Sequence, residues 1–477
     1  MTFDSRLILS EKERKALWEQ IAEAIELYRR KVPELAVAAR WELTQIRAAL
    51  REFSFEKTSS PAQVVDFVVK AMTQGQLATS HPAYFGVFNP APATMGIAGE
   101  WLAAAFNPQL ASFTSAPFAI ELEQHLLREF GQWFGMENGE GTFTTGGTEA
   151  NQTALLTALT KHFPSFGTGG VRSLPRKPLI YVSGETHHSI LKAAKLCGLG
   201  TEAVREIPAR RDLRFDGEAL QSQLERDRAA GHDPFFLVAT AGTTNAGTVD
   251  PIEELALIAR AHKLWLHLDA AWGGAVAILP EMKTLFRGAE KVDSVTLDAH
   301  KWLAAPMTAG MFLTRHTGLL EKTFRVDNTF YMPVTSRDTA VAQPYAQSMS
   351  WSRRFNGLKV FLTLAVCGWE GYRELFRRQI ALGERLKQKL RKCDWDVVNQ
   401  TELPVACFRA APMMDYEWLA THVGRSGISW VTTTRLSHFG TTLRAGITNF
   451  NTTEADLETL LMALDLARKS WVANAKN

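Results

Sequence analysis

The chain has 477 residues, with 53 Lys and Arg against 50 Asp and Glu, 22% charged residues and 46% hydrophobic residues. This balance is typical of a globular protein and excludes the disordered and collagen-like classes, and at about 150 residues per domain the length predicts more than one domain. A net charge of +3 gives no reason to expect nucleic-acid binding, which needs clustered cations. A chain of this length buries enough surface to need neither a metal nor disulfides for stability.

Residues 1–15 lack the apolar core of a signal peptide, and the four cysteines form no CxxC motif, so we expect a reducing compartment and a cytoplasmic protein. The longest stretch nearly free of charge, residues 71–120, contains five prolines and cannot run as one spanning helix. We therefore expect no membrane partner. Because this stretch lacks charge and regular periodicity, we predict that it packs under a site or against a second subunit.

In chain order, the first expected element is an amphipathic helix over residues 10–32, where Ser10 and Glu13 have the spacing of a capping box. From about residue 122 the pattern alternates between helices and short apolar runs. We predict helices at 121–134, from just after 148, and at 252–263, and buried strands at 179–182, 235–240, 265–269 and 294–298. Strand, helix and strand in this order predict a largely parallel sheet with right-handed crossovers.

The C-terminal part of the chain reads as a smaller α+β domain. After a strand at 310–315 and an irregular stretch at 326–352, we predict helices at 353–369, 371–392 and 454–467, and strands at 395–398, 405–410 and 443–450. The fold class is therefore α/β. We place the domain boundaries as a helical segment at 1–75, a large domain at 76–368 and a small domain at 369–477.

Polar side chains follow all four buried strands, at the edge where open α/β sheets bind ligands. They are His187 and His188, Thr243 and Thr244, Asp269, and Asp298 with His300 and Lys301. Each residue alone is more often a helix cap or a solvated loop residue. Together, at one sheet edge, they indicate a functional site.

The segment GTFTTGGTEAN at 141–151 places a glycine pair at a helix start, where free backbone N–H groups suit a phosphate. Its spacing matches neither the P-loop nor the dinucleotide fingerprint. A phosphate cradle, an Asp and a Lys on one sheet edge are what pyridoxal phosphate requires: the lysine forms a Schiff base with the aldehyde, and the carboxylate keeps the ring nitrogen protonated. We therefore expect pyridoxal 5'-phosphate as the cofactor.

At this point the motifs carry a family resemblance: they are HPAYFGVFNP, TTGGTEAN, ETHHSILKA, ATAGTTNAGTVDPI, WLHLDAAWGG and SVTLDAHKWL. From about residue 76 to about 370 the chain resembles the group II pyridoxal-phosphate-dependent amino-acid decarboxylases, which include the aromatic-amino-acid, glutamate and cysteine-sulfinate enzymes. The resemblance implies a fold-type I enzyme. Such an enzyme has a large domain around a mostly parallel sheet, a smaller α+β C-terminal domain and a helical N-terminal segment.

The resemblance also implies a role for individual residues. Lys301 corresponds to the Schiff-base lysine and Asp269 to the partner of the ring nitrogen, with the Ala271 methyl against the ring face. His187 corresponds to the imidazole that stacks over the ring, and Tyr331 to the loop tyrosine that protonates the carbanion after CO₂ leaves. The residues implied to hold the phosphate are Gly146, Gly147, Thr148, Thr244 and His300.

The substrate is the least determined part of the prediction. The resemblance suggests that the side-chain pocket is lined by His81, Tyr84, Phe85 and Phe88, and no Lys or Arg occurs between Lys70 and Arg128, which favours an aromatic L-amino acid. Against this, Arg444 falls near the carboxylate-binding arginine of members that take acidic substrates. Glutamate, aspartate or cysteine sulfinate therefore remain the alternative substrates.

Other readings share the lysine and the aspartate. An aldehyde synthase decarboxylates and then oxidatively removes the amine, an aminotransferase uses the same two residues, and a non-catalytic homologue would bind the cofactor without turnover. The HKW context of Lys301 and the loop tyrosine favour decarboxylation. The resemblance further implies a homodimer with active sites at the interface.

Overall fold

The computed structural model describes residues 7–326, 341–410 and 413–474. Its contacts divide the chain into a first unit, residues 1–87, 414–432 and 451–477, and a second unit, residues 88–413 and 433–450. The domain boundaries expected near residues 75 and 368 stay predictions.

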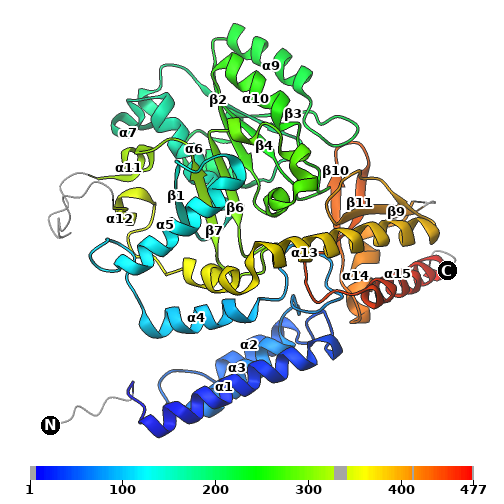
Figure 1. Cartoon of the computed structure of the whole chain (residues 1–477). Helices are drawn as coiled ribbons and strands as arrows, with labels where there is room; N and C mark the ends of the chain where they lie inside the picture. The colour runs from blue at the N-terminus through cyan, green and yellow to red at the C-terminus, as the bar shows by residue number, and fades with distance from the viewer. Residues whose placement is uncertain (1–6, 327–340, 411–412, 475–477) are drawn as a thin grey trace, which may run out of the picture. The chain divides into compact units, whose positions relative to one another are not determined.

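The first unit is helical, and its helices are α1 (Glu11–Lys31), α2 (Leu43–Arg51), α3 (Pro61–Gln74), α14 (Tyr416–Ser426) and α15 (Glu454–Asn474). The expected capping box starts α1: the Ser10 hydroxyl accepts the Glu13 backbone N–H at 3.3 Å, and the Ser10 N–H donates to the Glu13 carboxylate at 2.8 Å. Figure 1 shows α1 alongside α3, and α14 packs against α15. The N-terminal helix is thus confirmed.

The second unit is built around a seven-stranded sheet in the order β1-β7-β6-β5-β4-β2-β3. The strands are β1 (Glu140–Thr144), β2 (Pro178–Ser183), β3 (Val204–Ile207), β4 (Asp233–Thr240), β5 (Trp265–Asp269), β6 (Ser294–Asp298) and β7 (Gly310–Thr314). Neighbours from β3 to β6 pair in parallel, while β7 runs antiparallel to β6 and β1 antiparallel to β7. The largely parallel sheet is therefore confirmed, and two strands that were not expected, β1 and β3, form its edges.

Alternating side chains of this sheet feed two separate cores, one on each face. In β2, Leu179 and Tyr181 belong to one buried cluster, and Ile180 and Val182 to the other. The first cluster includes apolar side chains of α5 (Pro117–Gly131), α9 (Gly217–Ala229) and α10 (Ile252–His262), and the second those of α6 (Gly147–His162) and α8 (Ser189–Leu196). Because both faces are covered, the strands read as continuous apolar runs in the sequence.

A second, four-stranded sheet lies near the end of the chain in the order β10-β11-β9-β8, with β8 (Trp395–Val397), β9 (Val405–Ala410), β10 (Thr432–Leu436) and β11 (Gly440–Gly446). The strand expected at 443–450 begins and ends earlier, because the chain leaves the sheet at Ile447, whose N–H bonds the Pro404 carbonyl at 2.9 Å. The two helices expected before this sheet form α13 (Gly357–Lys392), which Gly368 interrupts with φ 64° and ψ 168°. Figure 1 shows α13 as one long element.

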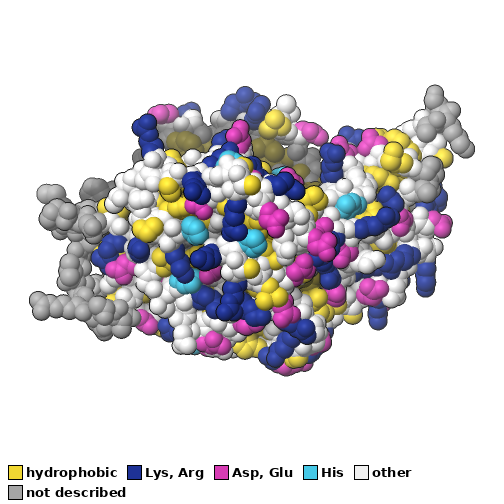
Figure 2. All heavy atoms as spheres, turned by 90° about the horizontal axis from the view of Figure 1, so that it is seen from above, with side chains coloured by type: hydrophobic (Ala, Val, Ile, Leu, Met, Phe, Trp, Pro, Cys, Tyr) yellow, Lys and Arg dark blue, Asp and Glu magenta, His cyan; other side chains and the backbone are white. Residues whose placement is uncertain are grey.

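The stretch 71–120 does not form one long helix: α3 ends in it, and a further helix that was not expected, α4 (Thr94–Phe106), crosses α13. In the described parts of the chain, no helix has both the length and the apolar content to cross a membrane. The short helices α7 (Phe166–Gly169), α11 (Leu319–Phe324) and α12 (Pro344–Gln347) complete the second unit. On the face shown in Figure 2, the described residues mix cationic and anionic side chains, in keeping with the small net charge.

Candidate active site

The carboxyl ends of the central strands meet at one edge of the large sheet, as the strand register shows. Asp269, the last residue of β5, pairs with Thr240 at the end of β4 and with Thr296 in β6. Asp298, the last residue of β6, pairs with Gly310 at the start of the antiparallel β7. The register thus brings together the strand ends at which the sequence predicted polar groups.

Asp269 is buried at this edge, with 5% of its surface exposed. One carboxylate oxygen accepts the backbone N–H of Ala271 at 3.1 Å, and the other accepts the side-chain amide of Asn151 at 2.8 Å. The two contacts fix the orientation of the carboxylate. Asn151 lies on α6, and sequence reasoning did not single it out, although it belongs to the segment that carries the glycine pair.

Lys301 lies in a turn that follows β6, and its backbone N–H donates to the Asp298 carbonyl at 3.1 Å. Its Nζ lies 3.0 Å from Oδ2 of Asp298, a carboxylate with 2% side-chain exposure, and Nε2 of His300 lies 3.7 Å from the same oxygen. Asp298 therefore balances the charge of the lysine. The Lys301 side chain keeps 28% exposure, so its amine is accessible to a small molecule.

The glycine pair lies at the start of α6, beside Asp298, Ala271 and His300. A Cβ added to Gly147 would lie 3.0 Å from the Asp298 carboxylate and 3.4 Å from the Ala271 methyl, and a Cβ on Gly310 would lie 2.5 Å from the Gly146 Cα. The chain therefore needs glycine at these close approaches. They leave the first N–H groups and the positive end of the α6 dipole at the sheet edge, with Thr148 half-buried in the first turn.

His300 lies against this helix start: a Cβ added to Gly146 would lie 3.4 Å from Cε1 of His300. Its Nδ1 accepts the Ala309 backbone N–H at 3.1 Å, so a neutral ring carries its proton on Nε2. Burial lowers the pKa of His300, and the Asp298 carboxylate opposes this shift. A neutral imidazole is therefore expected at pH 7, with its Nε2–H available to a ligand.

His187 and Thr244 follow β2 and β4 at the same edge. The Nδ1 of His187 accepts the Ser189 backbone N–H at 3.2 Å, which leaves the proton of the neutral ring on Nε2. Desolvation lowers the pKa of His187, and the nearby Asp269 carboxylate opposes the shift. Thr244 is half-buried in a turn that is held by a hydrogen bond of 2.9 Å between the Thr243 and Thr248 hydroxyls.

The residues expected to line a substrate pocket fall into both units. In the first unit, the ring nitrogens of His81 contact the Pro33 carbonyl at 3.2 Å and the Ala83 N–H at 3.0 Å, Tyr84 stacks on Trp430, and Phe85 is fully buried. In the second unit, the guanidinium carbon of Arg444 lies 4.5 Å from the ring centroid of Phe88, which stacks on Trp272 at 4.1 Å. Tyr331 lies outside the described residues.

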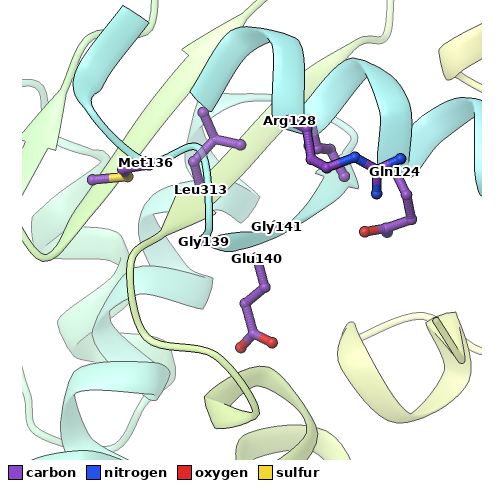
Figure 3. A pocket seen from close by; sticks show the side chains of 8 residues that line it. Gln124, Arg128, Met136, Gly139, Glu140, Gly141 and Leu313 are labelled. Carbon is purple, nitrogen blue, oxygen red and sulfur yellow. The ribbon is translucent and has the colours of Figure 1, made fainter. Parts of the chain in front are cut away.

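A small cavity lies at the opposite edge of the sheet, beside the start of β1 (Figure 3). Its volume is about 10 Å³, which holds no more than one water. Its Glu140 carboxylate points away from Arg128 and accepts the backbone N–H groups of Gly318 and Leu320 at 2.9 and 2.7 Å. Glu140 thus caps α11 and lies far from Lys301 in the register, so this cavity is not part of the site.

The described residues fit pyridoxal phosphate. A buried, oriented carboxylate, a lysine amine and a helix start kept bare by glycine lie on one sheet edge, and these are the groups that suit the ring nitrogen, the aldehyde and the phosphate. A mostly parallel sheet with this arrangement defines a pyridoxal-phosphate enzyme of the α/β class.

Comparison with known proteins gives the family. The conserved domain of the pyridoxal-dependent decarboxylases matches residues 47–411. The chain is 30% identical to the aromatic-L-amino-acid decarboxylase of Bacillus atrophaeus over 370 residues, 77% of this chain and 75% of that one, and 30% identical to the cysteine sulfinic acid decarboxylase of Rattus norvegicus over 346 residues, 72% and 70%. The crystal structure of mouse CSAD superposes with a TM-score of 0.89 at 25% identity, covering 96% of this chain and 99% of that one.

The chain therefore belongs to the pyridoxal-dependent decarboxylases, and the resemblance noted in the sequence is confirmed. It is a carboxy-lyase that uses pyridoxal phosphate and acts on a small-molecule amino acid. The fold class is confirmed as well, with the helical N-terminal segment and the second, small sheet. The role of each site residue remains a prediction.

Proposed function

We propose that Lys301 and Asp269 are the two residues on which decarboxylation depends. The observation that carries this proposal is their placement: Asp269 ends β5 and Lys301 follows β6, and these neighbouring parallel strands are in register at one sheet edge. Lys301 would hold the cofactor aldehyde through its Nζ. Asp269 would hold a proton on the ring nitrogen, because a buried carboxylate stabilises a cation beside it.

When bound, the cofactor supplies an electron-withdrawing ring that accepts the electrons released with CO₂. The chain supplies the geometry. The N–H groups of Gly146, Gly147 and Thr148, with Thr244 and the Nε2–H of His300, would hold the phosphate and so fix the ring. His187 would cover one face of the ring and the Ala271 methyl the other, and Tyr331 would return a proton to the substrate carbon.

We propose an aromatic L-amino acid as the substrate. The segment between Lys70 and Arg128 carries no cation, and Phe88 within it stacks on Trp272. The Arg444 guanidinium lies over the Phe88 ring, and aromatic surfaces of this kind favour a flat, apolar side chain. The same arginine supports the second candidate, an acidic substrate, since a buried guanidinium recognises a carboxylate through paired hydrogen bonds.

Release of CO₂ from each common L-amino acid and from cysteine sulfinate separates the two candidates. We expect turnover of tryptophan, tyrosine or phenylalanine, and we expect Arg444→Met to retain the ranking of substrates. Release from glutamate, aspartate or cysteine sulfinate alone, abolished in Arg444→Met, would establish the acidic candidate instead. Parallel assays for peroxide and ammonia identify an aldehyde synthase, and a cofactor-loaded protein that releases no CO₂ from any amino acid would be a non-catalytic homologue.

We further propose that two copies of the chain associate and that the protein is cytoplasmic. The helix α4 exposes Trp101, Leu102 and Phe106 to 42, 44 and 81%. Exposed apolar side chains gathered on one helix are typical of an interaction surface. None of the four cysteines forms a disulfide, in keeping with a reducing compartment.

A further inference from the structure

A chain of hydrogen bonds between buried side chains runs behind Asp269, from β6 and β5 to α6. The indole Nε1 of Trp265 lies 2.9 Å from the hydroxyl of Ser294, and this hydroxyl lies 2.8 Å from Nδ1 of His267. Nε2 of His267 lies 3.0 Å from Oδ1 of Asn151, whose Nδ2 donates to Oδ2 of Asp269 at 2.8 Å. Each of the five side chains belongs to a residue that is at most 5% exposed, so water does not compete for these bonds.

The donor and acceptor groups determine the direction in which this series of hydrogen bonds runs. An indole nitrogen can only donate and a carboxylate can only accept. Because Nδ2 of Asn151 donates to Asp269, Oδ1 of Asn151 accepts from Nε2 of His267. In a neutral ring Nδ1 then accepts, so the Ser294 hydroxyl, which accepts from Trp265, donates to Nδ1 of His267. Every hydrogen bond in the chain points toward Asp269.

The side-chain amide of Asn151 is fixed from all sides. Its Nδ2 also donates to the Ser189 hydroxyl at 2.8 Å, and its Oδ1 also accepts the Thr296 hydroxyl at 2.7 Å. The two hydroxyls could bond either orientation, but a flipped amide would turn its oxygen toward the Asp269 carboxylate, which cannot donate, so the amide has one favourable orientation.

His267 is held as a neutral ring. Burial lowers its pKa to about 4, although the Asp269 carboxylate opposes the shift, and the ring stacks on Phe236 at 5.9 Å. At pH 7 the imidazole therefore carries one proton, as the hydrogen-bond chain requires.

We propose that Asn151 and His267 are positioning residues, which hold the Asp269 carboxylate as a fixed acceptor for the ring nitrogen of the cofactor. The proposal rests on the proposed role of Asp269. Neither residue contacts the reacting atoms: Asn151 acts on the carboxylate, and His267 acts on Asn151. Both roles follow from the hydrogen bonds described above. A buried network holds a charged group more rigidly when every donor and acceptor in it has a partner.

The first test is on the cofactor-free protein, so that it does not depend on activity. In long-range proton–nitrogen NMR of histidine-labelled protein, the signal lost in His267→Gln identifies His267. We expect a neutral ring protonated on Nε2 throughout pH 5.5 to 8. A proton on Nδ1, or a titration near the ordinary histidine value, would overturn the hydrogen-bond chain, whatever Asp269 does.

The second test follows the ring nitrogen of nitrogen-15-labelled pyridoxal phosphate in the loaded enzyme, together with kcat. We expect Asn151→Leu and His267→Phe to lose ring-nitrogen protonation and about 10- to 100-fold in kcat, the range for one hydrogen bond to a charged group. His267→Gln restores a donor near Nε2, so it should stay within about 3-fold, and so should the control Thr157→Val, a buried hydroxyl of α6 that bonds only its own helix. A protonated ring nitrogen and unchanged kcat in His267→Phe would overturn the proposal even if Asn151→Leu fails to fold. If Asp269→Asn were fully active while His267 is protonated on Nε2 as expected, the proposed role of Asp269 would be wrong but the series of hydrogen bonds would stand.

Discussion

The Asp269 carboxylate illustrates how much of a single residue's chemistry is set by its neighbours. One of its oxygens is held by a backbone N–H and the other by an amide, inside a site where 5% of the residue is exposed. A carboxylate in such surroundings lacks the solvent that would otherwise balance it, so a cation placed beside it interacts strongly.

Asp269→Asn should bind the cofactor and barely turn over. The substitution leaves Lys301 and the helix start of α6 unchanged, but removes the charge that would hold the ring nitrogen protonated. Leaving a buried cation without its partner costs about 3 to 5 kcal/mol, a rate loss of roughly a hundred- to several thousand-fold. The measurement is kcat of the cofactor-saturated variant, with the absorbance of the bound cofactor as the loading control. Activity close to that of the wild type would refute this role.

Asp250 gives a prediction about pH and stability. Burial raises its pKa to about 7, although its carboxylate accepts the N–H groups of Thr240 and Phe215 at 2.8 and 2.9 Å and Arg214 also opposes the shift. Between its unfolded value near 4 and about 7, the folded state binds more protons than the unfolded state. Stability from this group is therefore present at low pH and lost as the pH rises, by about 3 kcal/mol between pH 5 and 7.5.

The check compares thermal midpoints of the cofactor-free wild type and Asp250→Asn at the two pH values. Between pH 5 and 7.5 the wild type should lose a few degrees relative to the variant. A difference between the two proteins that does not change with pH would show that Asp250 is ionised throughout. The absolute stability of the variant does not enter, since both proteins are compared with themselves.

How far the site can be predicted from the sequence depends on where a residue lies in its element. Asp269 and Lys301 follow apolar runs, and parallel strands present their carboxyl ends at the same edge of a sheet, so the sequence alone places these two residues together. Asn151 and His267 cannot be found in this way. An asparagine in the first turns of a helix and a histidine inside a buried strand have no distinctive spacing, and only the packing of α6 on β5 brings them together.

Where α4 packs on α13, glycine residues of α4 allow a close approach that any side chain would prevent. A Cβ on Gly99 of α4 would lie 2.6 Å from the Cα of Lys359 on α13 and 2.9 Å from its nitrogen. A Cβ on Gly96 would lie 2.4 Å from Cδ of Pro306, which lies between β6 and β7. These are backbone and ring atoms that cannot rotate away. Lys359 itself is buried and pairs with Glu100 of α4 at 2.5 Å.

Gly99→Ala should destabilise the protein although alanine is the better helix former. The gain in helix propensity is about 1 kcal/mol, whereas forcing a methyl group into a close helix contact costs about 1 to 3 kcal/mol. The matched control is Gly371→Ala in α13, where the nearest atom is the rotatable Cys367 Sγ at 2.8 Å. We expect a lower thermal midpoint for the first variant and an unchanged or higher one for the second. Equal midpoints would mean that α4 moves aside freely.

Several elements that the sequence predicted are buried on both sides or marked by a cap. The runs of β4, β5 and β6 are almost fully buried, and α1 carries its capping box. Among the missed elements, three of the four residues of β3 and four of the five residues of β10 are not buried, and α4 begins without a side-chain cap. The helices α9 and α14 were missed although Asp216 and Asp415 cap them. The formation of β3, β10 and α4 depends on pairing with strands or helices distant in the sequence, which a local pattern does not report.

The small net charge of the whole chain, together with the mixed charges on the face that Figure 2 shows, favours a small-molecule substrate over an extended anionic partner. The exposed apolar side chains of α4 are the surface through which we propose that two copies of the chain associate. Since α4 also packs closely on α13, a copy bound there would rest on a firmly held helix.

Replacing Trp101 and Phe106 together by Glu should convert a dimer into a monomer. Charges on this surface would have to be desolvated at the interface, and the apolar area that holds it would be lost. The control is Leu257→Glu, which changes a side chain on α10 that is 60% exposed, and which should remain dimeric. Light scattering on each protein decides. A wild-type monomer, or a double variant with the mass of the wild-type dimer, would contradict the proposed interface.

Borohydride reduction of the cofactor-loaded protein, followed by peptide mass mapping, tests most directly where the chemistry resides. Reduction makes the bond between the cofactor aldehyde and a lysine permanent, so the modified peptide identifies the lysine. We expect one phosphopyridoxyl group, carried by the peptide that contains Lys301, and none in Lys301→Ala. The same modification on another lysine, or none at all in a fully loaded sample, would show that Lys301 does not hold the cofactor.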